Sequence, residues 1–436
     1  PEWGFGVLSY VVYKRTYART LPEGGSEEYW QTCERVVNGV FELQRRHVPH
    51  AWDPVLAQIQ AQEMFRYMWD FKFLPPGRGL WSMGAPLLME RGHAGCVYNC
   101  AFRSTKDIDA AFSAPFRFLL EASAVGVGVG FDTRGEGKVT IVAPKKGPRW
   151  RWTWTGPRRV RHVIADSREG WSVALGIVLE AYAGRGVLPE FDYSQIRPFG
   201  APIKTFGGTA SGPDALRELL EIDIPEILAT PGKAISSGQI VDLMNAIGKC
   251  VVAGGARRSA EIALGRHDDE EFITLKADKE KVMKWRWASN NSIMAPRSLS
   301  DYSRFADLII KSGGEPGFVW LENCREYGRF VDGYRGDDMG ILGMNPCSEI
   351  GLEDGELCNV VEEFPARCES LEEFIAVARI AFLYAKTVSL LPTPWAITND
   401  AIRRNRRIGV SLSGIVQNIA KRGEDTHYEW CDAAYK

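Results

Sequence analysis

The stretch from Gly343 to Val360, G-M-N-P-C-S-E-I-G-L-E-D-G-E-L-C-N-V, most strongly constrains how this chain folds. Pro346 removes a backbone donor and disfavours helical geometry at the residue before it, so N-P-C-S-E is expected to form a fixed loop. If that loop is extended, alternate side chains project to one side, namely those of Asn345, Cys347 and Glu349. The E-D-G-E turn then predicts a hairpin whose return arm carries Cys358. Two thiols, an amide and a carboxylate are therefore expected in one cavity.

Each of these residues alone has a simpler interpretation. A free cysteine is often a small buried hydrophobe, and Glu349 would then be a solvated side chain. The combination N-P-C-S-E-I followed by L-C-N-V, however, resembles the finger-loop signature of ribonucleotide reductases. The resemblance implies that Cys347 becomes a thiyl radical and abstracts the 3′-hydrogen of a ribonucleotide. It further implies that Asn345 and Glu349 hold the 2′- and 3′-hydroxyls, and a buried Glu349 would have a raised pKa.

Composition excludes several other classes of protein. The 436 residues carry a net charge of -2, so no global basic field favours duplex nucleic acid as a partner. No apolar run reaches eighteen residues and no charged-then-apolar leader opens the sequence, so neither a membrane span nor a secretory signal is expected. Nine scattered cysteines, an odd number, fit a reducing cytoplasm better than a disulfide framework. Their spacing does not complete a zinc site, and no metal site is expected.

A second cysteine segment, G-C-V-Y-N-C-A-F, covers residues 95–102 and is rich in β-formers. In the family that the sequence resembles, a strand near this point carries the partner of the cysteine at 358. The N-C-A-F portion matches best, so the resemblance selects Cys100 rather than Cys96. The Cys100/Cys358 dithiol would supply two electrons and close to a disulfide, to be reduced again by a thioredoxin-like protein. Such a pair needs Cα atoms within about 6 Å.

The run V-G-V-G-V-G-F at 125–131 follows a segment, Asp109 to Ala124, that is expected to be an amphipathic helix. Alternating glycines remove Cβ atoms from one side of a strand and allow another backbone to approach closely. The run is not G-x-G-x-x-G and precedes no helix, which disfavours a dinucleotide fingerprint. Tight strand packing is one explanation; the resemblance implies a segment that faces the substrate. The residues expected to bind substrate are Asn99, Gly126, Gly128, Gly130 and Ser348.

Two Gly-rich segments resemble the specificity loops of the family, which relay the identity of a deoxynucleotide effector to the substrate base. The first, within 196–213, presents amides and hydroxyls suited to an anion. The second, A-G-G-A-R-R-S-A at 253–260, follows an apolar helix at 240–252, and its paired arginines suit phosphate or base recognition. A surface arginine pair is the simpler alternative. The effector residues expected are Gly207, Gly208, Thr209, Ser211, Gly254, Gly255, Arg257, Arg258 and Ser259.

The resemblance covers nearly the whole chain and implies an α/β fold: the ten-stranded barrel of ribonucleotide reductases, with its C-terminal strands missing. Residues 1–90 are expected to form a mainly helical region and 91–436 the barrel. A basic, Trp-rich insertion at about 132–169 is either a stacking platform for bases or a twisted, solvated hairpin. Amphipathic helices are expected at 50–74 and 371–391, and barrel strands at 285–293, 314–321 and 405–415.

The subgroup that the sequence resembles is the monomeric, adenosylcobalamin-dependent ribonucleoside-triphosphate reductases. That resemblance implies adenosylcobalamin as cofactor, a ribonucleotide substrate, a deoxynucleoside triphosphate effector, and a monomer or dimer. Asp425 and His427 open a D-x-H, but Trp430 stands where a D-x-H-x-x-G cobalamin motif needs glycine, which is compatible with this subgroup. Two alternatives remain open: the large subunit of an oxygen-dependent reductase, and a noncatalytic nucleotide-binding fragment.

Overall fold

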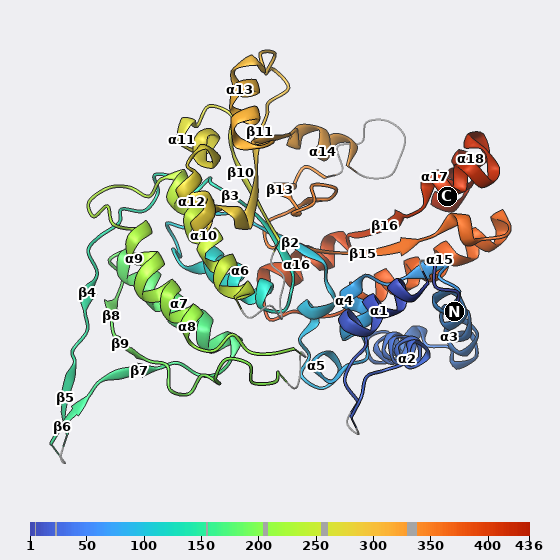
Figure 1. Ribbon diagram of the computed structural model, residues 1–436, viewed down its shortest axis with the longest axis horizontal. Helices are drawn as coiled ribbons and strands as arrows, with labels where there is room; N and C mark the ends of the chain where they lie inside the picture. Colours follow the sequence, from blue (N-terminus) through green and yellow to red (C-terminus); the bar gives the residue numbers. More distant parts are fainter. Residues whose placement is uncertain (5, 22–23, 154–155, 204–207, 254–259, 329–337) are drawn as a thin grey trace. The chain divides into compact units, whose positions relative to one another are not determined.

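The computed structural model describes residues 1–436 apart from 5, 22–23, 154–155, 204–207, 254–259 and 329–337, and it leaves out the side chains of 150–159. The chain divides into two compact units (Figure 1). The first unit contains residues 1–99 and 357–436, and the second contains residues 100–204 and 208–356. Each unit is considered by itself. The division into domains that the sequence suggested stays a prediction.

A parallel sheet of five strands forms the centre of the second unit. Its strands, in spatial order, are β2 (Cys100–Arg103), β3 (Gly128–Asp132), β10 (Glu261–Arg266), β11 (Ser289–Met294) and β12 (Gly317–Val319). Helices α6 (Ala114–Ala124), α7 (Arg168–Tyr182) and α10 (Ser237–Val252) pack beside one another, as Figure 1 shows. Parallel neighbours require such crossover connections. The helix expected from Asp109 is present but begins later, and the strands expected near 285–293 and 314–321 are confirmed.

Local sequence explains where the main helices begin. Ser236 forms a capping box with Gln239 at the start of α10, and Ser167 accepts a hydrogen bond from the third amide of α7. Ser370 caps α15 (Leu371–Val388) in the same way. Each hydroxyl satisfies an amide that the first helical turn leaves without a partner. The helices expected at 240–252 and 371–391 are confirmed.

The insertion contains short strands in pairs. Strands β5 (Trp150–Thr153) and β6 (Gly156–Arg159) are antiparallel, which confirms a hairpin in the Trp-rich segment; its stacking role stays a prediction. Two further pairs are parallel: β4 (Lys145–Lys146) with β8 (Val187–Leu188), and β7 (Arg161–Val163) with β9 (Glu190–Asp192).

The first unit is mainly helical. Helices α2 (Tyr29–His47) and α3 (Pro54–Trp69) pack together and against α15. Strand β1 (Phe73–Leu74) is antiparallel to β15 (Leu357–Glu363), and β15 is parallel to β16 (Ile408–Leu412), the strand expected after the basic turn. Of the apolar residues that predicted α3, Met64 and Met68 are fully buried. Its first turns are exposed at Val55, Leu56 and Ile59.

Shorter helices complete the two units. In the first unit these are α1 (Val7–Thr16), α4 (Gly77–Ser82), α5 (Pro86–Met89), α16 (Ala396–Asn405), α17 (Ile415–Arg422) and α18 (Glu424–Tyr435). In the second they are α8 (Asp214–Glu218), α9 (Ile224–Ile227), α11 (Glu270–Thr274), α12 (Lys279–Lys284), α13 (Ser303–Ser312) and α14 (Leu321–Tyr327).

Glu363, the last residue of β15, makes the stability of the first unit depend on pH. Its side chain is 1% exposed, and its Oε1 has no hydrogen-bond partner among the described residues. Burial, followed by the charge of Glu362, raises the pKa of Glu363 to about 8. Because folding favours the protonated acid, the free energy of unfolding should fall as pH rises from about 4.5 through about 8. Urea unfolding at pH 5 and pH 9 measures this loss.

Glu363→Gln should remove most of that loss and stabilise the protein at pH 9 by on the order of 4 kcal/mol. The exposed Glu369 offers a matched control, since Glu369→Gln should leave the pH dependence unchanged. Equal unfolding free energies of Glu363→Gln and wild type at pH 9 would show that Glu363 is not the group responsible.

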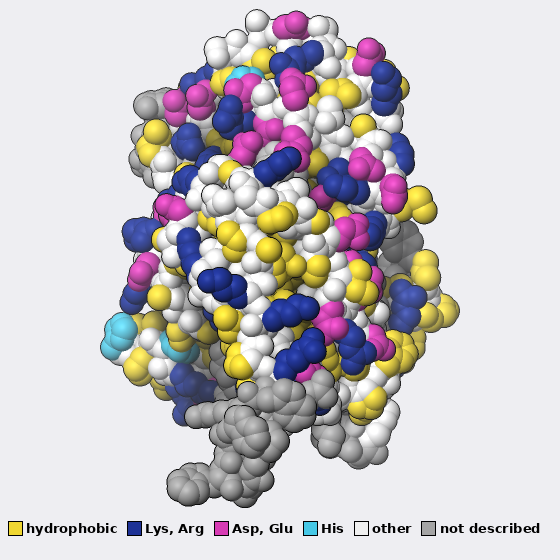
Figure 2. Space-filling model, turned by 90° about the vertical axis from the view of Figure 1, so that its left-hand side faces the viewer, with side chains coloured by type: hydrophobic (Ala, Val, Ile, Leu, Met, Phe, Trp, Pro, Cys, Tyr) yellow, Lys and Arg dark blue, Asp and Glu magenta, His cyan; other side chains and the backbone are white. Residues whose placement is uncertain are grey.

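The described surface mixes charges of both signs. Figure 2 shows Lys and Arg interspersed with Asp and Glu over the face that it presents, in keeping with the net charge of -2. Among the residues described, no helix combines the length and apolar character needed to cross a bilayer.

Candidate active site

The segment that carries Cys347 is a short hairpin of the second unit. Strand β13 (Gly343–Met344) pairs antiparallel with β14 (Gly351–Leu352), and residues 345–350 close the loop between them. The Asn345 amide donates to the Ile350 carbonyl at 3.1 Å, and the Ile350 amide donates to Asn345 Oδ1 at 3.0 Å. We call residues 343–352 the cysteine hairpin. The fixed loop expected at N-P-C-S-E is present.

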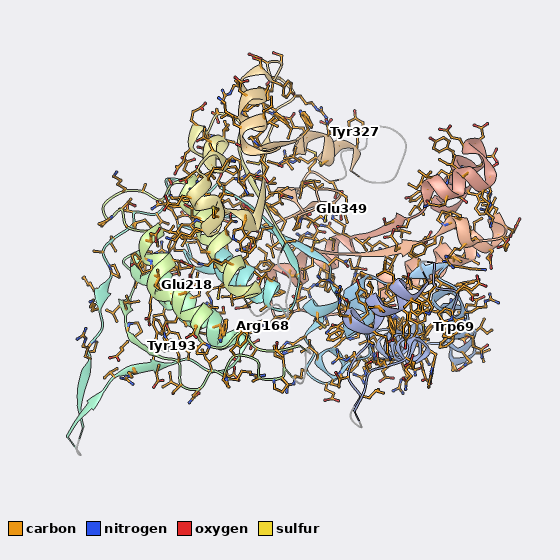
Figure 3. All side chains as sticks on the ribbon, in the orientation of Figure 1. Trp69, Arg168, Tyr193, Glu218, Tyr327 and Glu349 are labelled. Atoms are coloured by element: carbon orange, nitrogen blue, oxygen red, sulfur yellow. The ribbon has the colours of Figure 1, made fainter. Side chains whose placement is uncertain are left out.

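The loop is not extended, so the expected alternation of side chains is wrong. The Ser348 amide donates to the Asn345 carbonyl at 2.9 Å, and Ser348 has a φ of 64°. This tight turn buries Asn345 completely while Cys347 and Glu349 are exposed. Figure 3 shows Glu349 on the cysteine hairpin. The buried environment expected for Glu349 is therefore absent.

The E-D-G-E segment forms a turn, but the hairpin lies before it. The Glu356 amide donates to the Glu353 carbonyl at 3.1 Å, and Gly355 has a φ of 73°. Asp354 holds the turn by pairing with Arg103 at 2.7 Å. The arms that pair are β13 and β14, so the expected hairpin with Cys358 on its return arm is misplaced.

Glycines let the cysteine hairpin lie directly on the sheet. An ideal Cβ on Gly130 would come 2.0 Å from the Met344 carbonyl oxygen, and one on Gly128 would come 3.1 Å from Pro346 Cγ. An ideal Cβ on Gly343 would come 2.0 Å from the Phe102 ring. The contacts at Gly130 and Gly343 are closer than a Cβ permits, and the contact at Gly128 is tighter than usual. The close backbone approach expected in V-G-V-G-V-G-F is confirmed at Gly130.

A buried carboxylate holds the base of the cysteine hairpin, and sequence reasoning missed it. Asp132 is fully buried and accepts hydrogen bonds from Ser104 Oγ at 2.7 Å and from the Thr105 amide at 2.8 Å. Arg134 pairs with Asp132 and also donates to the Leu342 carbonyl at 2.9 Å. The signal was the D-x-R that begins at the last residue of β3, since buried charges persist only when paired.

The local environment disfavours the thiolate form of Cys347. Burial raises the pKa of the Cys347 thiol, and the charges of Glu349 and Cys100 raise it further. A thiol that stays S–H suits hydrogen-atom chemistry, whereas a nucleophilic cysteine needs a lowered pKa. Asn345 uses its Oδ1 within the loop, but its buried Nδ2 has no hydrogen-bond partner among the described residues. That donor can serve a hydroxyl of a bound ligand, because buried amides are costly when unpaired.

The predicted redox cysteines belong to different units. Cys100 lies on the same face of the sheet as the cysteine hairpin, with its Sγ 3.4 Å from an ideal Cβ on Gly128. Cys358 is fully buried in the first unit, where its carbonyl accepts from the Asn99 amide at 2.9 Å. Asn99 Oδ1 accepts from the Val360 amide at 3.1 Å, so this side chain binds the backbone of β15. The Cys100/Cys358 pairing stays a prediction.

The first specificity loop is partly described and the second is not. The Gly200 amide donates to the Ala210 carbonyl at 3.0 Å, and Pro202 forms an antiparallel β-bridge with Thr209. The two arms of the loop therefore run side by side in opposite directions. Gly208 takes the positive φ of 76° that this turn requires. The predicted effector residues outside the described part of the chain are Gly207, Gly254, Gly255, Arg257, Arg258 and Ser259. Gly126, a predicted substrate residue, ends α6 with a φ of 85°.

Gly130→Ala should displace the cysteine hairpin and lower turnover of the complete protein by about a hundredfold, because a shift of about 1 Å at a reacting group can cost that much. Steady-state rates measured beside thermal unfolding test this expectation. Gly186→Ala is the matched control, since an ideal Cβ there meets nothing within 4 Å. Turnover of Gly130→Ala equal to that of the control would contradict the packing described.

Comparisons with known proteins agree with this geometry. Residues 1–85 match the family model of the ribonucleotide reductase alpha domain, and residues 146–228 match the insertion domain of B12-dependent ribonucleotide reductase. The adenosylcobalamin-dependent ribonucleoside-triphosphate reductase of Euglena gracilis is 44% identical over the whole chain, and that of Lactobacillus leichmannii is 36% identical over 95% of it. A crystal structure of a B12-dependent (class II) ribonucleotide reductase superposes with a TM-score of 0.82 at 34% identity.

The fold and the cysteine hairpin define the class: an α/β protein whose central sheet supports a loop-borne thiol. The chain belongs to the ribonucleotide reductase family, within its B12-dependent branch. The α/β barrel class expected from the sequence is thereby confirmed. The superposition includes 95% of this chain and 63% of the crystal structure's chain. The chain spans 59% of the length of the Euglena relative and 62% of the Lactobacillus one.

No metal cluster is formed by the described residues: no three His, Cys, Asp or Glu side chains converge on one point. His427, which opened the incomplete D-x-H, is buried and its Nδ1 lies 2.9 Å from Asn418 Nδ2.

Proposed function

We propose that the complete protein containing this chain reduces ribonucleoside triphosphates to 2′-deoxyribonucleoside triphosphates by a thiyl-radical mechanism. The observation that carries the proposal is the position of Cys347: an exposed thiol with a raised pKa on a hairpin whose Met344 and Pro346 lie against a glycine-lined strand beside Cys100. The triphosphate class follows the names of the relatives, which are ribonucleoside-triphosphate reductases dependent on adenosylcobalamin. These names favour this reaction over the oxygen-dependent alternative.

Each residue of the loop has a role in this proposal. The Cys347 sulfur takes the 3′-hydrogen of the bound ribonucleotide and returns it at the end of the reaction. The free Nδ2 of Asn345 donates to a ribose hydroxyl. Glu349 accepts the 3′-hydroxyl proton, and its exposed carboxylate becomes desolvated when substrate covers it. Ser348 fixes the turn through its positive φ.

Removal of the 2′-hydroxyl requires two electrons and two protons. The Cys100/Cys358 dithiol supplies both as it closes to a disulfide, and the hydroxyl leaves as water. A dithiol reductant of thioredoxin type then reopens the disulfide. Cys100 is assigned to this task rather than Cys96 because the N-C-A-F portion of the segment carries the family resemblance.

Adenosylcobalamin, when bound, supplies the radical that converts the Cys347 thiol to a thiyl. The exposed side chain of Cys347 fits direct access by such a group. What the chain itself contributes is position: Pro346 packs on Gly128 and Arg134 holds Leu342, so the sulfur keeps a fixed place on the sheet.

An effector site is proposed near the first specificity loop. A surface cavity of about 670 Å³ lies beside Pro198 and Pro213, which bracket the loop. The guanidinium of Arg217 lies 4.8 Å from the centre of the Tyr193 ring, and the Tyr193 hydroxyl donates to Glu221 at 2.9 Å. Its volume suits a nucleotide, and its lining combines two arginines and two aromatic rings with the carboxylates of Glu190, Asp192 and Glu221. The oligomeric state, monomer or dimer, stays a prediction, and so does the cytoplasmic location.

The experiment is a product assay on the complete protein. With adenosylcobalamin, a dithiol and each ribonucleoside triphosphate, chromatography should detect the matching deoxynucleotide, and omission of the cofactor should abolish it. Ribonucleoside diphosphates serve as the competing substrates. A folded, cofactor-supplied protein that forms no deoxynucleotide would refute the proposed reaction, and preference for diphosphates would refute only the substrate class.

A further inference from the structure

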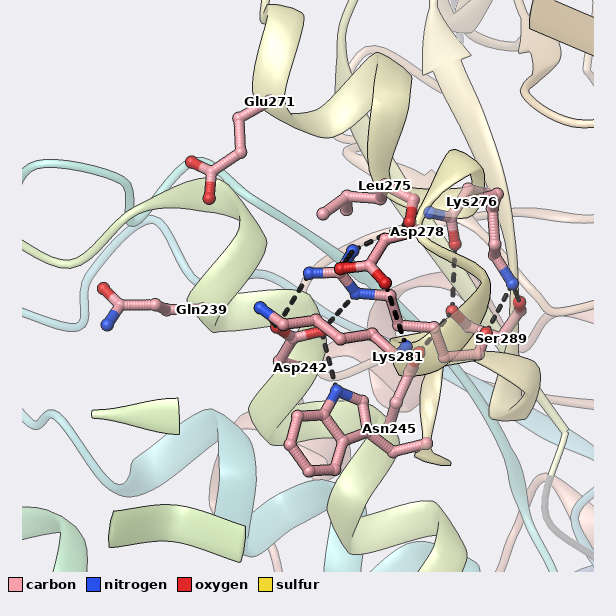
Figure 4. A network of polar contacts seen from close by, with 12 residues as sticks. Gln239, Asp242, Asn245, Glu271, Leu275, Lys276, Asp278, Lys281 and Ser289 are labelled. Atoms are coloured by element: carbon pink, nitrogen blue, oxygen red, sulfur yellow. Dashed lines mark hydrogen bonds and ion pairs between the residues drawn. The ribbon is translucent and has the colours of Figure 1, made fainter. Parts of the chain in front are cut away.

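A buried polar network lies between α10 and the starts of β10 and β11. Figure 4 shows its centre, where Asp242 accepts hydrogen bonds from Arg286 Nε at 2.5 Å and from the indole of Trp285 at 2.9 Å. Asp242 and Arg286 are 3% and 5% exposed. Buried ion pairs rarely add stability over apolar packing, so such a network indicates a requirement for specific geometry.

Glu261 extends this network to the end of the second specificity loop. It is the first residue of β10, 3% exposed, and its Oε2 accepts from Asn245 Nδ2 of α10 at 3.0 Å. Its Oε1 lies 2.0 Å from the position of an ideal Cβ on Gly248, so the glycine makes room for the carboxylate on α10. Asn245 Oδ1 in turn accepts from Ser289 Oγ at 3.2 Å. The Glu261 carboxylate thus ties β10 to α10, and the Asn245 amide ties α10 to β11.

The residue before Glu261 touches the site of chemistry. The Ala260 carbonyl accepts from the Val129 amide at 2.9 Å and lies 3.4 Å from an ideal Cβ on Gly128. The same Cβ position is 3.1 Å from Pro346 and 3.4 Å from the Cys100 sulfur. Since alternate residues of a strand face opposite sides of the sheet, Ala260 lies toward the cysteine hairpin and Glu261 toward α10.

The neighbouring turn of α10 is also tied to the helical segment 214–223, which helps to line the proposed effector cavity. Lys249, the residue after Gly248, pairs with Glu218 at 2.7 Å and with the buried Asp223 at 3.1 Å. Glu218 and Asp223 flank Glu221, which lines that cavity together with Arg217. A continuous set of contacts therefore runs from the cavity through α10 to residues 260 and 261.

We propose that Glu261 is a positioning residue through which effector binding sets substrate choice, by fixing residues 260 and 261 on α10 beside the cysteine hairpin. This inference rests on the proposed function. The Glu261 carboxylate fixes the start of β10 against Asn245 and Gly248 of α10. A movement of α10 is transmitted through the Glu261 carboxylate to the Ala260 carbonyl. That carbonyl, Pro346 and Cys100 all lie close to Gly128.

The test uses Glu261→Gln in the complete enzyme, a change that keeps the size of the side chain and removes its charge. For each of the four ribonucleoside triphosphates, kcat/KM is measured with and without each deoxynucleoside triphosphate. The variant should lose about fivefold or more of the effector-induced selectivity, the lower end of typical coupling between sites. Its effector-free turnover and its melting temperature should match wild type.

Asp278→Asn is the matched control, because Asp278 lies at the exposed edge of the same network, 4.0 Å from Arg286, and should leave selectivity unchanged. Asn245→Ala removes the donor from the opposite side and should reproduce the loss if Glu261→Gln does not fold. Full effector response in either folded variant would overturn the inference, as would equal losses with and without effector. A wild-type enzyme that forms no deoxynucleotide would instead refute the proposed function.

Discussion

Cys347→Ala in the complete protein is expected to abolish deoxynucleotide formation while nucleotide binding stays within about twofold of wild type. The thiol is the only group on the loop that can carry a hydrogen atom to and from C3′, and alanine leaves the backbone of the cysteine hairpin unchanged. Product formation should fall at least about a thousandfold, as it does when a reacting side chain is deleted. Product yield by chromatography and nucleotide affinity by calorimetry measure the two effects.

Cys324→Ala supplies the matched control, because Cys324 is a half-buried thiol that contacts Met344 of the cysteine hairpin at 3.6 Å but has no part in the proposed chemistry. It should retain turnover close to wild type. Residual product from Cys347→Ala above a thousandth of the wild-type yield would remove Cys347 from its proposed role, whatever the behaviour of the control.

Loss of either redox cysteine should stop sustained turnover. Cys100→Ser and Cys358→Ser each leave one thiol, which cannot supply two electrons and close to a disulfide. The yield of product per enzyme should not rise with time in the presence of excess dithiol, whereas wild type accumulates product. The measurement is a time course at enzyme concentrations high enough to detect one equivalent.

Cys96→Ser tests the choice between the two cysteines of the C-x3-C segment. Cys96 is fully buried in the first unit, so its variant should turn over repeatedly, with thermal unfolding recorded to confirm that it folds. Sustained product formation by Cys100→Ser combined with its loss in Cys96→Ser would show that the sequence resemblance selected the wrong partner for Cys358.

The sequence allowed several features to be predicted because they depend on local chemistry. Pro346 implied a fixed loop, and the apolar pattern predicted the helices at 240–252 and 371–391 that the structure forms as α10 and α15. Alternating glycines implied a close backbone approach, which the Met344 carbonyl makes at Gly130. The cysteine segments also carried the family resemblance, which the comparisons confirm.

Features that depend on long-range register could not be predicted. The positive φ of Ser348 and the Asn345 side chain close the loop on itself, and no alternation pattern reports such closure. The hairpin was therefore assigned to the wrong turn, and Glu349 to the wrong environment. Arg134, paired with Asp132, binds the Leu342 carbonyl about 200 positions further along the chain. A single sequence does not reveal such a pairing.

The most direct test of the central claim is a competition between ordinary and 3′-deuterated ribonucleoside triphosphate in the complete enzyme. If the Cys347 sulfur takes the 3′-hydrogen, the deuterated substrate reacts more slowly and the unreacted pool becomes enriched in deuterium as conversion proceeds. A 4′-deuterated substrate should show no such enrichment. Deoxynucleotide formation that leaves the 3′-deuterium content of the remaining substrate unchanged would contradict hydrogen abstraction at C3′.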